Sequence, residues 1–99
     1  MSAFTIVRFR ARPDQAEAFE RTYAAVERAL PGLKRFVLVK TGERSYCSIG
    51  EFETFDHIVA ARSAMSGNLD RFRHLLEPFD ETLGTTDPVS GEAVLDVHR

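Results

Sequence analysis

Two polar side chains fall where the spacing of apolar residues predicts a buried surface. Tyr23 lies at the centre of one helical stripe, and Arg62 lies inside a second one. A buried guanidinium needs an anionic or polar partner, and a buried phenol needs a hydrogen-bond partner. A pocket between a sheet and its helices would place both groups against a bound ligand. The alternatives are that the Arg62 stem packs while its head reaches water, and that Tyr23 is an ordinary core residue.

Two further polar residues could line the same pocket. Arg8 stands among apolar residues of a predicted first strand, and Tyr46 stands on a predicted hairpin strand. The neighbouring Cys47 has no basic residue on its own strand face, which indicates a small buried hydrophobe rather than a nucleophile. The sequence holds no Walker A loop, dinucleotide fingerprint or nucleophile elbow, so no phosphate-binding loop is predicted.

The histidines do not predict a metal site. Asp70, His74 and Glu77 share one face of a predicted helix, and a carboxylate beside an imidazole could bind a metal or act as a base. At about 100° per residue that face lies opposite the apolar residues, so we expect a solvated stripe. No two histidines fall at a metal-ligand spacing such as HxxxH, and no metal is expected.

The composition bounds the class of protein. The chain has 99 residues and a net charge of −2, which predicts a single domain over residues 1–99. That charge balance offers no basic patch for nucleic acid or for an anionic membrane. No apolar run approaches the roughly 18 residues of a spanning helix. The single cysteine excludes an internal disulfide, and we expect a soluble, cytoplasmic protein.

The first half of the sequence predicts a strand, a helix and a hairpin. Residues 3–10 read as a strand with apolar side chains on both faces. A helix follows Pro13 and ends at Pro31 and Gly32, because proline suits the first helical position and glycine suits the exit. Its expected buried stripe is Ala16, Phe19, Tyr23, Val26 and Leu30. Residues 34–40 and 45–52 are rich in β-branched and aromatic residues and flank a turn that contains a glycine.

The second half predicts two helices and a last strand. Thr54 can cap a helix whose buried stripe continues to Met65, and the Ser-Gly-Asn sequence at 66–68 breaks it. A third helix is expected from about residue 69 to residue 83, with a kink or an interruption at its proline. Residues 84–91 are dense in turn formers and predict a loop. Residues 92–98 predict the last strand.

The element order is βαββαβ, which is the ferredoxin-like split βαβ arrangement, an α+β fold with helices on one face of the sheet. The other face is also apolar in most strands, and an uncovered apolar face marks an interface. The simplest partner is a second copy related by a two-fold axis. We therefore expect a homodimer, a dimeric α+β barrel, with the two sheets packed face to face. The alternative is that the two-sided apolarity is only an imperfect pattern.

Residues 50–55 (GEFETF) resemble the strand-to-helix motif of the antibiotic biosynthesis monooxygenase-like family of dimeric α+β barrels. The residues that fit this motif are Glu51, Thr54 and Ala60, with Phe52 near a family tryptophan. Residues 12–19 resemble the first strand–helix unit of the family, and residues 30–33 resemble its helix exit. The resemblance spans most of the chain through short, apolar motifs.

The resemblance implies a small oxygenase that needs no metal, flavin or haem. Such an enzyme would bind a phenol or hydroquinone in a dry apolar pocket, favour its anion, and let the anion react with O₂ directly. On this interpretation Arg62 supplies positive charge, Tyr23 supplies a hydrogen bond, and Phe52 supplies an apolar wall. The catalytic residues would be Arg62 and Tyr23, and the substrate-binding residues would be Tyr46, Phe52 and Arg8.

Two alternatives stay open. One is a non-catalytic dimeric barrel that binds a small apolar ligand, or no ligand. The other is haem binding or degradation, for which family relatives use an asparagine on the first strand and a tryptophan on the second helix. The chain has neither. His74 lies near a family histidine position but is expected to face water, and Ala61 and Arg62 occupy the place of the family's helix-end histidine.

Overall fold

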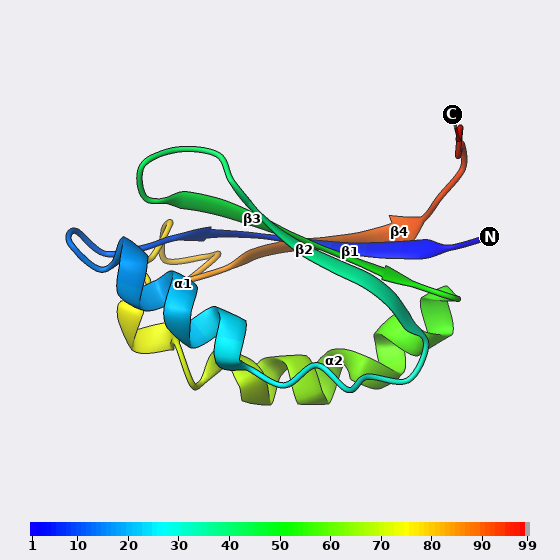
Figure 1. Cartoon of the computed structure of the whole chain (residues 1–99), viewed down its shortest axis with the longest axis horizontal. Helices are drawn as coiled ribbons and strands as arrows, with labels where there is room; N and C mark the ends of the chain where they lie inside the picture. The colour runs from blue at the N-terminus through cyan, green and yellow to red at the C-terminus, as the bar shows by residue number, and fades with distance from the viewer. Residues whose placement is uncertain (99) are drawn as a thin grey trace.

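Residues 1–98, which the computed structural model describes, form one antiparallel sheet with two α-helices on one of its faces (Figure 1). The elements in chain order are β1 (Ala3–Arg10), α1 (Ala16–Ala25), β2 (Leu33–Lys40), β3 (Ser45–Phe52), α2 (Phe55–Leu69), the 3₁₀ helix η1 (Arg73–Leu75) and β4 (Asp87–Glu92). The strand order in the sheet is β2-β3-β1-β4, and every neighbouring pair is antiparallel. The predicted ferredoxin-like α+β fold is confirmed.

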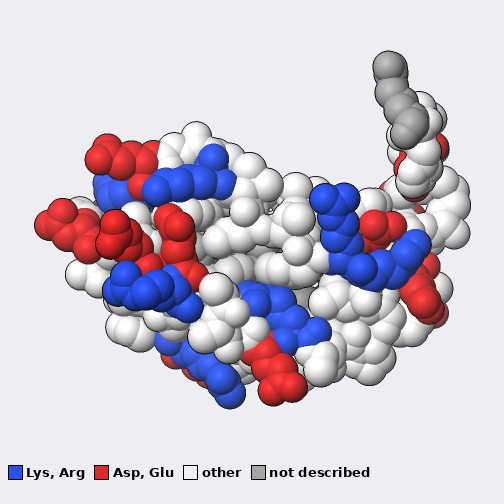
Figure 2. Space-filling view, viewed as in Figure 1, with Lys and Arg blue, Asp and Glu red and all other residues white. Residues whose placement is uncertain are grey.

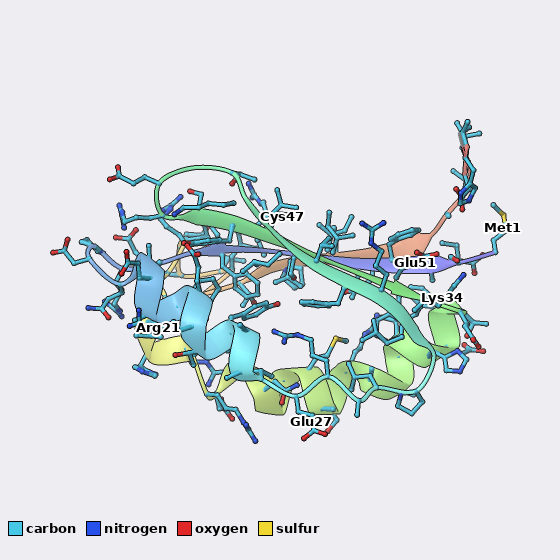
Figure 3. All side chains as sticks on the ribbon, viewed as in Figure 1. Met1, Arg21, Glu27, Lys34, Cys47 and Glu51 are labelled. Carbon is cyan, nitrogen blue, oxygen red and sulfur yellow. The ribbon has the colours of Figure 1, made fainter. Side chains whose placement is uncertain are left out.

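The pleat of the sheet sorts its side chains into a helix-facing side and an open face. In β1, Thr5, Val7 and Phe9 line the space beneath the sheet, whereas Ile6 belongs to the open face. Ile6 is paired with Ile49 of β3, so the alternation continues across the sheet. The apolar residues of the open face are Phe4, Ile6, Val37, Val39, Cys47, Ile49 and Val89. Figure 3 shows Cys47 on the side of the sheet away from the helices.

An aromatic cluster joins α1 to the helix-facing side of the sheet. Phe19 and Tyr23 of α1 pack against Phe9 of β1 and against Phe72, with ring centroids 4.9–5.8 Å apart. Such tilted and edge-to-face pairs contribute about 0.5–1.5 kcal/mol each beyond their buried area. Phe19 and Tyr23 are buried, as the stripe predicted. The cluster closes one end of the space beneath the sheet.

The predicted third helix is wrong. α2 continues through the Ser-Gly-Asn sequence to Leu69, and only the short η1 follows. Leu75 and Leu76 are buried, but they reach the core from a segment that hydrogen-bonds to the end of β1, where the Glu77 N–H donates to the Arg10 carbonyl at 2.7 Å. Pro78 has no N–H to continue a helix. The apolar spacing that resembled one helix is therefore divided between the end of α2, η1 and a short extended segment whose Leu76 pairs with Ala11 just after β1.

The predicted last strand is also misplaced. β4 covers residues 87–92, of which 87–91 were expected to form a loop, and its Val89 is paired with Ile6 of β1. Arg8 and Asp87 form an ion pair directly across this register. The apolar residues that predicted a strand lie beyond the sheet, where Val94 is 91% exposed and Leu95 is 80% exposed. Residues 87–92 pair with the edge of β1 that β3 leaves free, and the more apolar residues after them do not.

α2 begins as predicted. The Thr54 hydroxyl oxygen accepts the backbone N–H of His57 at 3.3 Å, which makes Thr54 the N-cap. Asp56 lies in the first turn, where the helix dipole favours negative charge. Within residues 1–98 no helix combines the length and the apolarity that crossing a membrane requires.

Candidate ligand site

A cavity of about 80 Å³ lies between the sheet and the two helices. Helix-facing residues of β1, β2 and β3 form its floor, and its rim comes from the segment after α1 and from the second half of α2. Most of its lining is apolar, which suits a small aromatic ligand. The polar lining residues are Thr5, Tyr23, Arg28, Ser48 and Asn68.

Arg28 is the cation of this cavity. Its guanidinium lies 4.3 Å from the ring centroid of Tyr23 and 4.4 Å from that of Phe36. Nη1 donates to the Val26 carbonyl at 2.8 Å, and Nη2 donates to the Tyr23 carbonyl at 2.7 Å. These contacts hold a positive charge in a mostly apolar lining, where it interacts favourably with any anion that enters.

Arg28 lines the cavity because α1 ends earlier than predicted. The predicted helix runs from Pro13 to about Leu30, but α1 covers only residues 16–25, and Val26 is already extended, with ψ of 128°. The segment after Val26 therefore folds back along the cavity instead of continuing the helix axis. Sequence reasoning missed Arg28 because a helical Arg28 would not belong to the buried stripe. The proline and the glycine at positions 31 and 32 suited a helix exit there, so the local pattern did not indicate that α1 ends at Ala25.

Tyr23 lines the cavity, as the sequence predicted for a pocket under the sheet. Its side chain lies beneath Arg28 and is almost fully buried. Burial raises the pKa of Tyr23, and the nearby Ser48 hydroxyl and Arg28 guanidinium oppose that rise only in part. The phenol is therefore protonated at neutral pH and is a hydrogen-bond donor.

Phe52 and Asn68 lie at the inner wall and at the rim. Phe52 is 1% exposed, and it packs with Ile58 and Ala61 of α2 in a second core cluster. Its predicted position in the apolar wall agrees with the structure. Asn68 Nδ2 donates to the Glu27 carbonyl at 3.4 Å and so links α2 to the segment that carries Arg28.

Arg62 does not point into the core, which corrects the expectation from the apolar stripe. Its side chain is exposed, and its guanidinium lies 5.8 Å from the ring centroid of Phe55. It borders a neighbouring groove between α2 and β4 rather than the cavity that holds Tyr23. The alternative in which the stem packs and the head reaches water describes it better.

Arg8 and Tyr46 lie outside the cavity lining. Arg8 projects from the open face, where it pairs with Asp87 and its guanidinium lies 5.6 Å from the ring centroid of Phe79. Tyr46 is on the helix-facing side but is 2% exposed beneath α1, where its hydroxyl donates to Glu20 Oε2 at 2.5 Å. The structure thus brings Tyr23 and Phe52 together and separates them from Arg8 and Tyr46.

The Tyr46–Glu20 hydrogen bond predicts an acid-sensitive link between β3 and α1. The Tyr46 hydroxyl and then Lys40 lower the pKa of Glu20, so the folded state gains stability above the usual glutamate pKa and loses it as pH falls through the lowered pKa. Replacing Tyr46 with phenylalanine should lower the midpoint of thermal unfolding by about 5 °C at pH 7. It should also flatten the loss of stability below pH 5. Thermal melts from pH 3 to pH 7 measure both effects, and an unchanged acid slope would contradict this role of the pair.

The histidines are apart from the cavity. His74 is exposed on η1, as expected of a solvated position. Its two predicted neighbours have other partners: Asp70 pairs with Arg73 at 2.7 Å, and Glu77 pairs with Arg44 at 3.3 Å. In the described part of the chain, no three His, Cys, Asp or Glu side chains gather closely enough to hold a metal ion.

The charges around the site are of mixed sign. Figure 2 shows lysine and arginine side chains interspersed with aspartate and glutamate over this face of the molecule, with uncharged residues between them. At the far end of the sheet, Lys34 and Glu51 pair at 3.4 Å, and both are labelled near Met1 in Figure 3. This face therefore offers a ligand one internal cation, Arg28, rather than a charged surface patch.

Comparisons with known proteins identify the fold. No family model matches the chain, and no curated protein matches it. SnoaB, a cofactor-independent oxygenase from Streptomyces nogalater, superimposes with a TM-score of 0.70 at 17% identity, over 99% of this chain and 98% of the other. A candidate antibiotic biosynthesis monooxygenase from Nitrosomonas europaea gives 0.74 at 17% identity, over 94% and 90%.

A third similar solved structure is that of a dimeric protein. A dimeric ferredoxin-like protein from an uncultured marine organism matches with a TM-score of 0.76 at 12% identity, over 99% of this chain and 92% of the other. At sequence identities of 12–17%, the structural similarity shows that these proteins share one fold. In that fold the chain is similar to the antibiotic biosynthesis monooxygenase-like proteins, which confirms the resemblance predicted from residues 50–55.

Proposed function

We propose that this protein is a cofactor-independent monooxygenase that oxidises a small phenol or hydroquinone with O₂. The observation that carries the proposal is the Arg28 guanidinium, held against two aromatic rings in an apolar cavity. A cation in a site of low polarity favours the anionic form of a phenol. The fold shared with a cofactor-independent oxygenase supports the same reaction class.

The reaction needs no external electron donor. A phenolate gives electrons to O₂, a peroxide forms at an unsubstituted ring carbon, para to the oxygen in a phenol and ortho to it in a hydroquinone, and loss of water leaves a quinone or a hydroxyquinone. One oxygen atom enters the product and the other leaves as water, so phenol and O₂ balance quinone and water. The protein has to favour the anion, hold the ring, and keep bulk water away from the peroxide.

Three residues divide these tasks. A guanidinium has five N–H donors, and Arg28 commits two nitrogens to the Val26 and Tyr23 carbonyls, which leaves further N–H groups for the substrate oxygen. Tyr23, kept protonated by burial, donates a hydrogen bond to the same oxygen. Phe52 supplies the dry inner wall. We assign the cationic role to Arg28 in place of Arg62, because Arg28 lines the cavity with Tyr23.

Replacing Arg28 with glutamine tests this assignment. Glutamine keeps a donor for the backbone carbonyls but removes the charge, so kcat/KM should fall about 30-fold, as expected for losing ~2 kcal/mol of charge-assisted hydrogen bonding. Arg28→Lys keeps the charge without the planar stacking and should lose less. O₂ uptake across a panel of phenols and hydroquinones measures the rate, and ¹⁸O₂ shows whether one labelled atom enters the product.

Arg21→Gln is the matched control. The Arg21 side chain is 73% exposed on α1 and pairs with Glu17 at 3.9 Å, away from the cavity, so its loss should leave the rate unchanged. Equal rates for the Arg28→Gln and Arg21→Gln variants would refute the role of Arg28. Ligand binding without O₂ uptake in the wild type would instead favour the non-catalytic binding protein. A Soret shift on titration with haem would favour the haem-binding alternative.

We further propose that two copies form a homodimer through their open sheet faces. In the single chain the apolar residues there are only partly buried or exposed, and Val89 is 59% exposed. The dimeric ferredoxin-like neighbour supports this arrangement. Because the cavity lies on the opposite side of the sheet, each copy would keep its own ligand site.

A further inference from the structure

Two hollows lie side by side beneath β1, with Met65 between them. The first is the cavity of about 80 Å³ described above. The second, of about 240 Å³, is a groove that opens between α2 and β4. The residues that line both hollows are Thr5, Val7, Phe9 and Met65. The first hollow opens near Arg28, and the second opens near Arg62.

The first hollow is too small for the ring it would have to bind. An apolar cavity of about 150 Å³ is known to hold benzene in a protein core. The cavity beside Arg28 offers about 80 Å³, so even an unsubstituted phenol needs room that the resting side chains occupy. The adjacent groove, about 240 Å³, has that room, and Met65 borders it as well as the cavity. A ring against Arg28 must therefore displace Met65 or extend past it.

Met65 is the part of the shared wall that can move. Thr5, Val7 and Phe9 belong to β1, which is paired on both sides, by β3 and by β4. Met65 projects from α2, is only partly buried, and packs at the edge of the Phe52 cluster. Its unbranched thioether side chain has three rotatable bonds and adapts to gaps of different shape. Rotation of Met65 would join the two hollows without disturbing the sheet.

We propose that Met65 determines the specificity of the site and that the ligand extends past it into the groove beneath β4. The ring lies against Arg28 and Tyr23, and a second apolar group on the ring occupies the groove lined by Ile58 and Leu69. The ligand class is therefore a phenol or hydroquinone with a bulky apolar substituent rather than a bare ring. The inference rests on the proposed function for the identity of the ring.

Anaerobic binding tests this inference without requiring catalysis. The dissociation constants of hydroquinone and of phenylhydroquinone are measured for the wild type and for the Met65→Ala, Met65→Phe and Met65→Leu variants. Alanine should shift the ratio of the two constants about tenfold towards phenylhydroquinone, because it joins the hollows. Phenylalanine should shift the ratio about tenfold the other way. Leucine, which conserves volume, should leave it near the wild-type value.

A second readout does not depend on any variant. The chain has two methionines, and Met1 is 77% exposed at the end of the sheet. In a sample labelled with ¹³C-methyl methionine, phenylhydroquinone should shift the Met65 signal and leave the Met1 signal in place. A ratio that stays within twofold across the variants, or an unmoved Met65 signal with bound ligand, would overturn the inference. Absence of binding by either compound would overturn the inference and the proposed function together, whereas binding with an unchanged ratio would overturn the inference alone.

Discussion

Replacing Gly32 with alanine is expected to destabilise the folded state by about 4 kcal/mol, close to the whole stability of a marginal domain. Gly32 has φ of +80°, where an alanine is strained, and an added Cβ would lie 2.4 Å from Cγ of His57. The His57 ring cannot retreat freely, because Nδ1 lies 2.7 Å from the Thr54 hydroxyl. The Gly32 carbonyl also accepts the Glu53 N–H at 2.9 Å, which holds the backbone. Thermal unfolding should show a midpoint lowered by roughly 20 °C.

A double-mutant cycle with His57→Ala separates the two causes. In the His57→Ala background the contacts with Cγ and Cδ2 are gone and only the 2.9 Å contact with Cβ of residue 57 remains, so Gly32→Ala should cost mainly the backbone strain, about 2 kcal/mol. Gly67→Ala is the matched control: Gly67 lies within α2, nothing lies within 4 Å of its added Cβ, and the change should stabilise the protein by about 0.5–1 kcal/mol. An equal cost of Gly32→Ala in both backgrounds would show that packing against His57 is not the constraint.

The parts of the fold that were predictable from the sequence are those decided by local chemistry. β1 and β3 have the predicted bounds because β-branched and aromatic residues alternate along them and a short turn precedes β3. Thr54 caps α2 because its side-chain oxygen accepts a nearby backbone N–H. This contact too lies within one short segment of the chain. The correct order of these elements was enough to identify the ferredoxin-like fold.

The errors came from contacts between distant parts of the chain. The identity of β4 depends on which segment reaches the free edge of β1, and that segment contains Pro88 and Gly91, both poor strand formers. Val94 and Leu95 have better intrinsic strand preference but lie outside the sheet. Local strand preference does not show which segment pairs with β1, because that pairing joins residues about 80 positions apart in the chain.

The residues of the candidate site show the same difference between local patterns and contacts with distant parts of the chain. Tyr23 was found because it lies in a regular apolar stripe whose buried side could be predicted, and Phe52 was found through the resemblance of residues 50–55. Arg28 was missed because its position depends on where α1 stops. Arg62 was misplaced because the apolar arc of α2 is wider than the surface that meets the sheet, and Val59, in the same arc, is 47% exposed. A stripe predicts which residues can be buried, and the neighbouring element decides which of them are.

A charge at the centre of the open face should break the proposed homodimer. Ile49 is paired with Ile6 on one side and with Val37 on the other, so it lies in the middle of the apolar surface. Buried in a dimer, an aspartate at position 49 would have no partner, and dimerisation should weaken about 10³-fold, or ~4 kcal/mol. In the single chain that position is only partly buried, so the carboxylate stays hydrated and the fold should persist. Sedimentation of the wild type and the Ile49→Asp variant over a range of concentrations measures the difference.

Val59→Asp is the control for this change. Val59 is a similarly exposed apolar residue, but it lies on α2, away from the open face, so the variant should remain dimeric. The cavity is on the helix side of the sheet, and each copy supplies its own Arg28 and Tyr23. Monomeric Ile49→Asp protein should therefore bind phenylhydroquinone with nearly wild-type affinity. A wild type that is monomeric at 100 µM, or an Ile49→Asp variant as dimeric as the Val59→Asp control, would remove the open face as the interface. A dimer-dependent loss of ligand binding would show instead that the partner copy shapes the cavity through the sheet.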